Sequence, residues 1–199
     1  MADLAFTPVY WRLYDAWSRH PRYISMPGGT RSGKTYCILQ MLHLLIPEKD
    51  KPGDVTSVVS ETLPHLKRGA MEDLENIISD MGFTDGQEYT NNRSDHIFRF
   101  QNGSQIRLFS ADDWGKVKGS KRDILFINEG QNIRWETANQ LMIRTREFVI
   151  VDYNPTHEFW AHTELAADPR FKQIVSTYKD NRFLTQAQIE DIEKGKKKA

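Results

Sequence analysis

The sequence has few features of a secreted or membrane protein. It contains one cysteine, Cys37, so an internal disulfide framework is excluded and a reducing compartment is expected. No apolar run reaches the length that spans a bilayer, and the first residues contain no signal-peptide core. We therefore expect a cytosolic protein that does not associate with membranes.

The chain also lacks a net charge. Its 27 Lys and Arg residues equal its 27 Asp and Glu residues, so composition gives no global electrostatic argument for a nucleic-acid partner and none against a local basic patch. No internal repeat and no interior low-complexity linker is present. A chain of 199 residues can bury one full core. We expect residues 1–199 to form a single domain.

The most informative stretch is the glycine-rich loop G-G-T-R-S-G-K-T at positions 28–35. It fits the P-loop pattern G-x-x-x-x-G-K-[ST], in which the glycines let backbone N–H groups turn toward a phosphate. In this pattern Lys34 reaches the β- and γ-phosphates, and the Thr35 hydroxyl binds Mg²⁺. The predicted nucleotide-binding residues of the loop are Gly28, Gly29, Thr30, Arg31, Ser32, Gly33, Lys34 and Thr35.

The sequence on either side of the loop favours a nucleoside triphosphate site over a glycine-rich turn that binds nothing. Residues 23–26 (YISM) form a candidate strand before the loop, and residues 36–46 (YCILQMLHLLI) form a candidate buried helix after it. A P-loop joins a strand to a helix, and the amino end of that helix stabilises bound phosphate.

Candidate strands and helices alternate along the rest of the chain, and the Asn-Gly pair at 102–103 predicts a β-hairpin. This alternation predicts an α/β fold with a mostly parallel central sheet flanked by helices. The expected strands are residues 55–60, 97–100, 105–109, 124–127, 148–151 and 173–176, and the expected helices are residues 3–19, 66–81, 135–144, 157–167 and 186–194.

One expected loop, residues 111–122, combines basic side chains with a tryptophan. Its members of these two kinds are Lys116, Lys118, Lys121, Arg122 and Trp114. Cations with an aromatic side chain among them are typical of surfaces that contact nucleic acid. A solvated loop without a partner explains the same residues equally well.

Polar residues follow three apolar strands: the P-loop, Asn128-Glu129, and the segment from Asp152 to Thr156. Ligands of open α/β sheets bind at the carboxyl ends of strands, so these ends can meet at one nucleotide. A carboxylate beside a γ-phosphate can orient and polarise an attacking water, and Glu129 fits that role. The alternatives are a helix-start carboxylate for Glu129 and an ordinary turn for Asn154-Pro155. Their recurrence after two buried strands favours the functional interpretation.

Four segments together resemble the ATPase domain of the large terminase subunit, the DNA-packaging motor of tailed bacteriophages. They are GGTRSGKT at 28–35, ILFINEG at 124–130, VDYNPT at 151–156 and STYKDN at 176–181. A P-loop alone is unspecific, whereas an arginine within it and a later Asn-Pro pair are much more characteristic. The resemblance spans nearly the whole chain.

This resemblance implies a P-loop NTPase fold of the additional-strand, catalytic-glutamate type, with ATP and Mg²⁺ as cofactors. It implies an ATP-hydrolysing motor domain that drives double-stranded viral DNA into the prohead. By resemblance, Glu129 is the catalytic carboxylate, and Arg31 senses or stabilises the charge of the γ-phosphate. Asn154 is also predicted as a nucleotide-binding residue, and by resemblance it belongs to the motif that couples hydrolysis to domain movement.

The resemblance also implies partners and a place of action. The partners are double-stranded DNA, the portal of the prohead, the small terminase subunit and a C-terminal nuclease domain. The assembled form is a homo-oligomeric ring, with a monomer expected for the domain by itself, and the location is the cytoplasm of the infected bacterial host. Too few residues follow Asn181 to form the nuclease. We therefore expect residues 1–199 to be the ATPase domain alone, without nuclease activity.

Asn128 departs from the family pattern, whose second motif often ends in Asp-Glu with the Asp helping to hold Mg²⁺. An amide oxygen can ligate a metal but carries no charge, so a lower metal affinity is expected. We predict Thr35 and Asn128 as the protein ligands, with the metal held mainly by Thr35, phosphate oxygens and water.

Two other functions are compatible with a P-loop. A small-molecule kinase usually carries an arginine-rich lid, for which Arg144 and Arg146 are too few and too near a buried strand. A non-catalytic nucleotide-binding switch would not need a carboxylate placed like Glu129. ATPase assays with and without DNA distinguish these functions from the motor.

Overall fold

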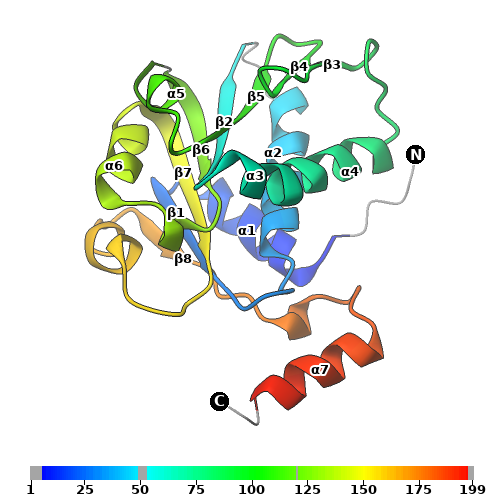
Figure 1. The fold of residues 1–199 in the computed structure, drawn as a ribbon, viewed down its shortest axis with the longest axis vertical. Helices are drawn as coiled ribbons and strands as arrows, with labels where there is room; N and C mark the ends of the chain where they lie inside the picture. The colour runs from blue at the N-terminus through cyan, green and yellow to red at the C-terminus, as the bar shows by residue number, and fades with distance from the viewer. Residues whose placement is uncertain (1–5, 49–52, 120, 197–199) are drawn as a thin grey trace.

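The computed structural model of the protein describes residues 6–48, 53–119 and 121–196. Within these residues, one sheet of eight strands forms the centre of the fold (Figure 1). Its strands are β1 (Tyr23–Pro27), β2 (Val55–Ser60), β3 (Tyr89–Asn92), β4 (Ile97–Phe100), β5 (Gln105–Ser110), β6 (Arg122–Ile127), β7 (Thr145–Tyr153) and β8 (Phe171–Gln173). They are ordered β3-β4-β5-β2-β6-β7-β1-β8.

In this spatial order, every neighbouring pair from β5 through β2, β6, β7 and β1 to β8 is parallel. Strand β4 is antiparallel to both of its neighbours, β3 and β5. The predicted hairpin of residues 97–109 is therefore confirmed, because β4 and β5 are joined by the short Asn-Gly turn. A mostly parallel sheet is also confirmed.

Helices cover both faces of the sheet. They are α1 (Pro8–Ser18), α2 (Lys34–Glu48), α3 (Leu63–Leu66), α4 (Glu72–Asp80), α5 (Trp114–Gly119), α6 (Trp135–Ile143) and α7 (Gln186–Lys196), with short 3-10 or π turns η1 (Lys67–Met71), η2 (Gly130–Asn132), η3 (Ala161–Leu165) and η4 (Tyr178–Asp180). The layer of α1, α2, α3 and α4 lies on one face, and α5, α6 and η3 lie on the other. Helix α7 lies outside both layers (Figure 1).

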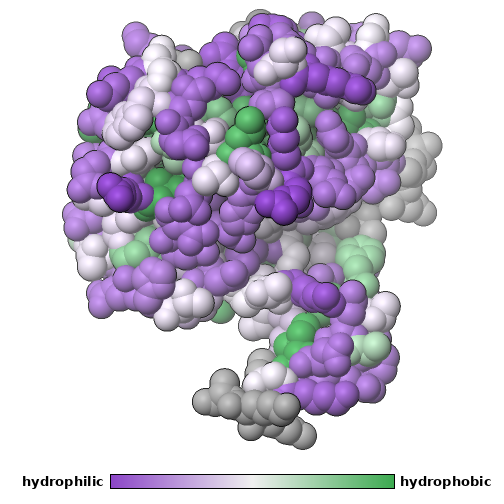
Figure 2. Space-filling model, viewed as in Figure 1, coloured by the Kyte–Doolittle hydropathy of each residue, from purple (hydrophilic) through white to green (hydrophobic). Residues whose placement is uncertain are grey.

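Each face of the sheet has its own apolar core. On β6, Ile124 and Phe126 join the core beneath α1, α2 and α4, whereas Leu125 and Ile127 join the core beneath α6. A strand segment buried on both faces favours apolar residues, which is why residues 124–127 of β6 and 148–151 of β7 are continuous apolar runs in the sequence. On the face of the molecule that Figure 2 shows, the surface is mostly hydrophilic, with apolar residues in small separate patches.

The order of the central strands sets up the functional edge of the sheet. Strand β7 lies between β1 and β6 and pairs with both in parallel. Pro27 is level with Tyr153, and Ile127 is level with Val151, so the carboxyl ends of the three strands lie at one edge. An extra strand between the P-loop strand and the strand that precedes Glu129 is the additional-strand arrangement that the resemblance implied.

Three predicted elements differ from the structure. The strand expected over residues 173–176 is instead β8, Phe171–Gln173, so the two ranges share only Gln173. The helix expected over residues 157–167 is reduced to the π turn η3. The helix expected over residues 66–81 begins at Leu63 and continues through α3, η1 and α4, so Lys67 lies inside it and not at its amino end.

Other boundaries agree closely with the predictions. Helix α1 covers the described part of the segment expected at residues 3–19, of which residues 3–5 lie outside the described residues. Thr185 caps α7, since its hydroxyl accepts a bond from the Gln188 N–H at 3.3 Å. In the described part of the chain, no helix is long and apolar enough to cross a membrane.

Candidate nucleotide-binding site

The P-loop joins the carboxyl end of β1 to the amino end of α2, as the sequence predicted. Arg31 and Gly33 both take positive φ angles, 65° and 78°, which turn the backbone sharply before the helix. A glycine suits such a position because an L side chain is strained there. Gly29, Thr30 and Arg31 are exposed, whereas Lys34 is 8% exposed. The loop therefore presents a free outer rim above a buried lysine.

The segment 176–181 packs against this loop, a contact that sequence reasoning left without a role. The Ser176 N–H donates to the Pro27 carbonyl at 2.9 Å, and the Ser176 hydroxyl donates to Ser32 Oγ at 3.0 Å. At its other end, Asn181 Nδ2 donates to the Arg31 carbonyl at 2.9 Å. The signal in the sequence was the run of polar residues at 176–181, which follows β8 and Ile174-Val175.

Gly28 is required by the close approach of this segment. A Cβ on Gly28 would lie 2.2 Å from Ser176 Oγ and 2.8 Å from the Ser176 carbonyl oxygen, whereas a Cβ on Gly29 would meet no atom within 4 Å. We predict that Gly28→Ala lowers the midpoint of thermal unfolding by about 2–10 °C through overpacking, and that Gly29→Ala leaves it unchanged. Equal midpoints for the two variants would contradict this account of the loop.

Lys34 and Asn154 lie in direct contact. The lysine Nζ donates to Asn154 Oδ1 at 2.9 Å, which joins the P-loop to the segment after β7. The resemblance placed Asn154 in a coupling motif, and this bond gives it a physical link to the residue that is expected to meet the phosphates.

Asp152 lies at the centre of the polar residues, although the sequence analysis did not include it among the predicted site residues. Its carboxylate is 0% exposed and accepts from Thr35 Oγ1 at 2.5 Å. It also accepts from Asn128 Nδ2 at 3.1 Å and from the Glu129 backbone N–H at 2.7 Å. The signal in the sequence was its place directly after the apolar run 148–151. Through Asp152, the structure brings Thr35, Asn128 and Glu129 together as predicted.

Glu129 is placed by a tight turn at the end of β6. Its φ and ψ are 53° and 54°, and Gly130 follows where a Cβ would lie 2.5 Å from Val151 Cγ1. The side chain is 31% exposed. Its Oε2 accepts from Asn132 Nδ2 at 3.2 Å and lies 3.2 Å from His65 Nε2 on α3. The contact with His65 could not be predicted from the sequence, because it joins two distant segments.

The basic segment 111–122 is not the continuous loop that we expected. It forms α5 and the start of β6, and Arg122 is 1% exposed. The Arg122 Nη1 donates to the Leu141 carbonyl at 2.8 Å, and Nε donates to Ser57 Oγ at 3.2 Å. Burial, followed by the charges of Arg144 and Arg107, lowers the pKa of Arg122 to about 10. Arg122 therefore supports the fold and cannot contact DNA.

The remaining lysines of this segment, Lys116, Lys118 and Lys121, are exposed, and Trp114 is 50% exposed. Lys116 pairs with Asp113 at 3.5 Å, and Lys118 Nζ lies 5.0 Å from the centroid of the Trp114 ring. These local contacts fit a solvated surface as well as a nucleic-acid interface, so the alternatives of the sequence analysis stay open.

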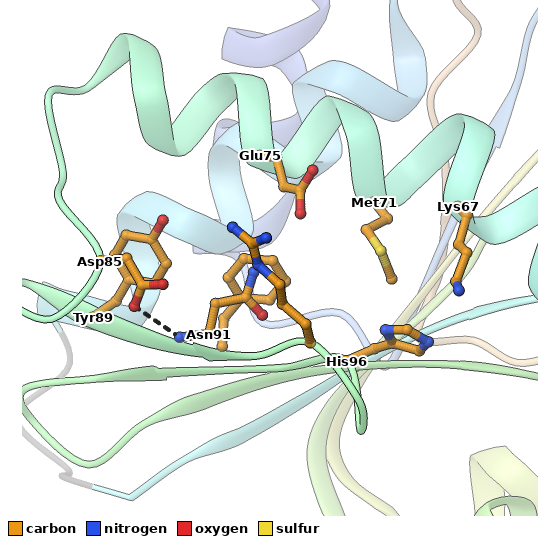
Figure 3. Close-up of a pocket in the computed structure, with 9 residues that line it drawn as sticks. Lys67, Met71, Glu75, Asp85, Tyr89, Asn91 and His96 are labelled. Carbon is orange, nitrogen blue, oxygen red and sulfur yellow. Dashed lines mark hydrogen bonds between the residues drawn. The ribbon is translucent and has the colours of Figure 1, made fainter.

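A groove of about 480 Å³ lies between the η1–α4 helix and the strands β3 and β4 (Figure 3). Its lining mixes both charges with apolar side chains, and Asp85 accepts from the Asn91 N–H within it. None of its lining residues belongs to the P-loop or to the ends of β6 and β7. The groove is therefore separate from the candidate nucleotide site.

Most of the chain matches the sequence model of one protein family. Residues 21–199 match the family described as the phage terminase large subunit. The chain belongs to this family. A search of curated proteins found no match.

Solved structures of large terminases share the fold of this terminase chain. The large terminase from a thermophilic bacteriophage gives a TM-score of 0.80 at 16% identity, over 96% of this chain and 50% of that chain. Its complex with ATP-gamma-S gives 0.76 at 16% identity, over 95% and 49%. The Thermus phage P74-26 large terminase ATPase domain gives 0.62 at 14% identity, over 87% and 82%. The terminase chain thus spans about half the length of the thermophilic phage enzyme, and this likeness concerns the fold alone.

Proposed function

We propose that this terminase chain is an ATP-hydrolysing motor domain that drives double-stranded viral DNA into the prohead. One observation carries the proposal: Lys34 and Thr35 of the P-loop lie in direct contact with the polar residues that end β7, beside Glu129 at the end of β6. Phosphate-binding groups and a carboxylate able to activate water therefore share one edge of the sheet. The nucleotide is inferred from the thermophilic phage terminase, which is known in complex with ADP and with ATP-gamma-S.

In this proposal the loop from Gly28 to Thr35 holds the phosphates through backbone N–H groups, and Lys34 exchanges Asn154 for the β- and γ-phosphates. Arg31, on the exposed rim, stabilises charge on the γ-phosphate. Glu129 accepts a hydrogen bond from a water and orients it for in-line attack. The contacts of Glu129 Oε2 with His65 and Asn132 fix the position of the carboxylate.

The site also fits Mg²⁺, which supplies charge neutralisation at the phosphates when it is bound. The Thr35 hydroxyl and the Asp152 carboxylate meet there, and oxygen ligands are those that Mg²⁺ prefers. In the described part of the chain, no group of three or more His, Cys, Asp or Glu side chains forms a ready metal cage. A nucleotide metal needs none, because phosphates and water supply most of its ligands.

The partners remain part of the proposal. We infer double-stranded DNA as the translocated polymer, and a homo-oligomeric ring that engages the prohead portal, the small terminase subunit and a C-terminal nuclease domain. The proposed location is the cytoplasm of the infected bacterial host. A ring is favoured because motors of this kind take a transition-state arginine from a neighbouring subunit, for which Arg144 and Arg146 are candidates.

ATPase assays with and without double-stranded DNA test the proposal. We expect slow, Mg²⁺-dependent hydrolysis whose rate per protein molecule rises with protein concentration. The reason is that a transition-state arginine supplied in trans is worth about 10³–10⁵ in rate. A small-molecule kinase would instead transfer phosphate to an acceptor, and a switch would bind ATP without turnover. Fast hydrolysis that is independent of protein concentration would contradict the need for a neighbouring subunit.

A further inference from the structure

Asp152 is a buried carboxylate surrounded by hydrogen-bond donors. The Thr35 hydroxyl, the Asn128 amide and the Glu129 backbone N–H all donate to it. Three donors stabilise the ionised form of a carboxylate, which can only accept. Among the described residues, no Lys, Arg or His side chain forms an ion pair with Asp152. Among the described residues, the Asp152 carboxylate is therefore buried at the P-loop without an ion pair.

A second carboxylate nearby makes this lack of a cation more costly. Burial, followed by the negative charges of Glu72 and Asp152, raises the pKa of Asp73 on α4 to about 6. A buried charge is tolerated when it is paired or when it coordinates a metal. The negative charge near Thr35 is thus suited to a cation that is not part of the polypeptide.

Asn128 is oriented to serve Asp152. Its Nδ2 faces the Asp152 oxygens at 3.1 and 3.4 Å, and its Oδ1 accepts from Ser60 Oγ at 2.9 Å. A carboxylate cannot donate to an amide oxygen, so the Asn128 NH₂ group has to face Asp152. The Asn128 oxygen consequently points to Ser60 and not toward Thr35 and Asp152.

We propose that Asp152 supplies the acidic Mg²⁺ ligand that the family pattern places at position 128, and that Asn128 positions this carboxylate. The inference rests on the proposed ATPase function and replaces Asn128 as the predicted ligand. Thr35 Oγ1 and Asp152 Oδ2 lie 2.5 Å apart, so both can enter one coordination shell after a small separation. Mg²⁺ holds its oxygen ligands at about 2.0–2.1 Å in an octahedron, which places neighbouring oxygens roughly 2.9 Å apart.

The consequence is that the acidic ligand has moved from one strand of the sheet to its neighbour. Strand β7 pairs with β6 in parallel, with Val151 level with Ile127, so positions 152 and 128 lie side by side at the sheet edge. Because Asp152 also accepts from the Glu129 N–H, the metal ligand is bonded directly to the backbone of the catalytic residue.

The test measures metal binding separately from hydrolysis. The parent protein, Asp152→Asn, Asn128→Ala and the exchanged pair Asn128→Asp/Asp152→Asn are titrated with Mn²⁺ in the presence of ADP and followed by electron paramagnetic resonance. Metal-free ADP affinity is measured by calorimetry, and folding by thermal unfolding. We expect Asp152→Asn to weaken Mn²⁺ binding at least about tenfold and to leave metal-free ADP binding unchanged. The exchanged pair should regain Mn²⁺ affinity, because it returns a carboxylate to the same edge.

Each outcome decides the matter. Parental Mn²⁺ affinity in a folded Asp152→Asn would overturn the assignment of Asp152. Loss of Mn²⁺ affinity in Asn128→Ala without loss in Asp152→Asn would return the ligand to Asn128. A parent protein that binds no ADP at all would overturn the ATPase function itself and this inference with it, which is a distinct result. If Asp152→Asn does not fold, the exchanged pair still gives the decision, since it keeps an amide facing a carboxylate. Mn²⁺ affinity near the parental value supports Asp152, and affinity clearly tighter than that of the parent would return the ligand to position 128.

Discussion

Lys34→Ala is expected to weaken ATP binding about 10- to 100-fold, because each charge-assisted bond to a phosphate is worth about 1.5–3 kcal/mol. The ammonium group is the charge that meets the β- and γ-phosphates in a P-loop. Lys34 is only 8% exposed, so water can do little to compensate for the loss of its ammonium group. Calorimetric titration with ATP and Mg²⁺ measures the change.

Two control variants make this result specific. Lys116→Ala removes an exposed lysine on α5 that pairs with Asp113, so it tests for a general effect of charge and should leave ATP affinity unchanged. Asn154→Ala removes the side chain that Lys34 contacts at 2.9 Å, and should leave affinity equal to or tighter than that of the parent. Unchanged ATP affinity in Lys34→Ala would refute the assignment of the loop at positions 28–35.

The fold was predictable from the sequence where local pattern and burial agree. The central parts of β2, β6 and β7 are short apolar or β-branched runs, which are typical of strands covered on both faces. The P-loop was found because its chemistry fixes residue types at fixed spacing. The alternation of these elements then required a parallel sheet with helices on both faces.

The errors arose where tertiary contacts override the local pattern. Arg122 was interpreted as a surface cation, but a distant carbonyl and hydroxyl receive its guanidinium inside the protein. The segment 157–167 has a helical pattern, yet Trp160 is fixed by its Nε1 bond to the Ile133 carbonyl at 2.7 Å, and only a π turn forms. Neither partner lies near in sequence, so no local rule could identify it.

The sequence identified most residues of the candidate site but not how they are arranged in space. The sequence places polar residues after each of three strands but does not state which strands are neighbours. Only the position of β7 between β1 and β6 puts Asp152 between Thr35 and Asn128. The same spatial order explains why Asn128 can lack a charge, since the neighbouring strand carries one.

Glu129→Gln is expected to abolish most ATP hydrolysis while ATP and Mg²⁺ bind as they do to the parent. Loss of a general base typically costs about 10²–10⁴ in rate. Glutamine has nearly the same shape as glutamate, and its oxygen can still accept from Asn132, which donates to Glu129 at 3.2 Å. The amide is a far poorer base, so the variant separates chemistry from binding.

The measurement combines steady-state hydrolysis with calorimetric titration of ATP-gamma-S in Mg²⁺. Glu136→Gln, an exposed glutamate on α6, is the matched control and should keep the parental rate. The expected result is specific to position 129, because the backbone there is fixed by the turn at the end of β6 and by the hydrogen bond from the Glu129 N–H to Asp152. This backbone position directs the Glu129 side chain to the site. If Glu129→Gln keeps a near-parental rate, the water-activating group lies elsewhere, and Asp152 is the neighbouring carboxylate to test next.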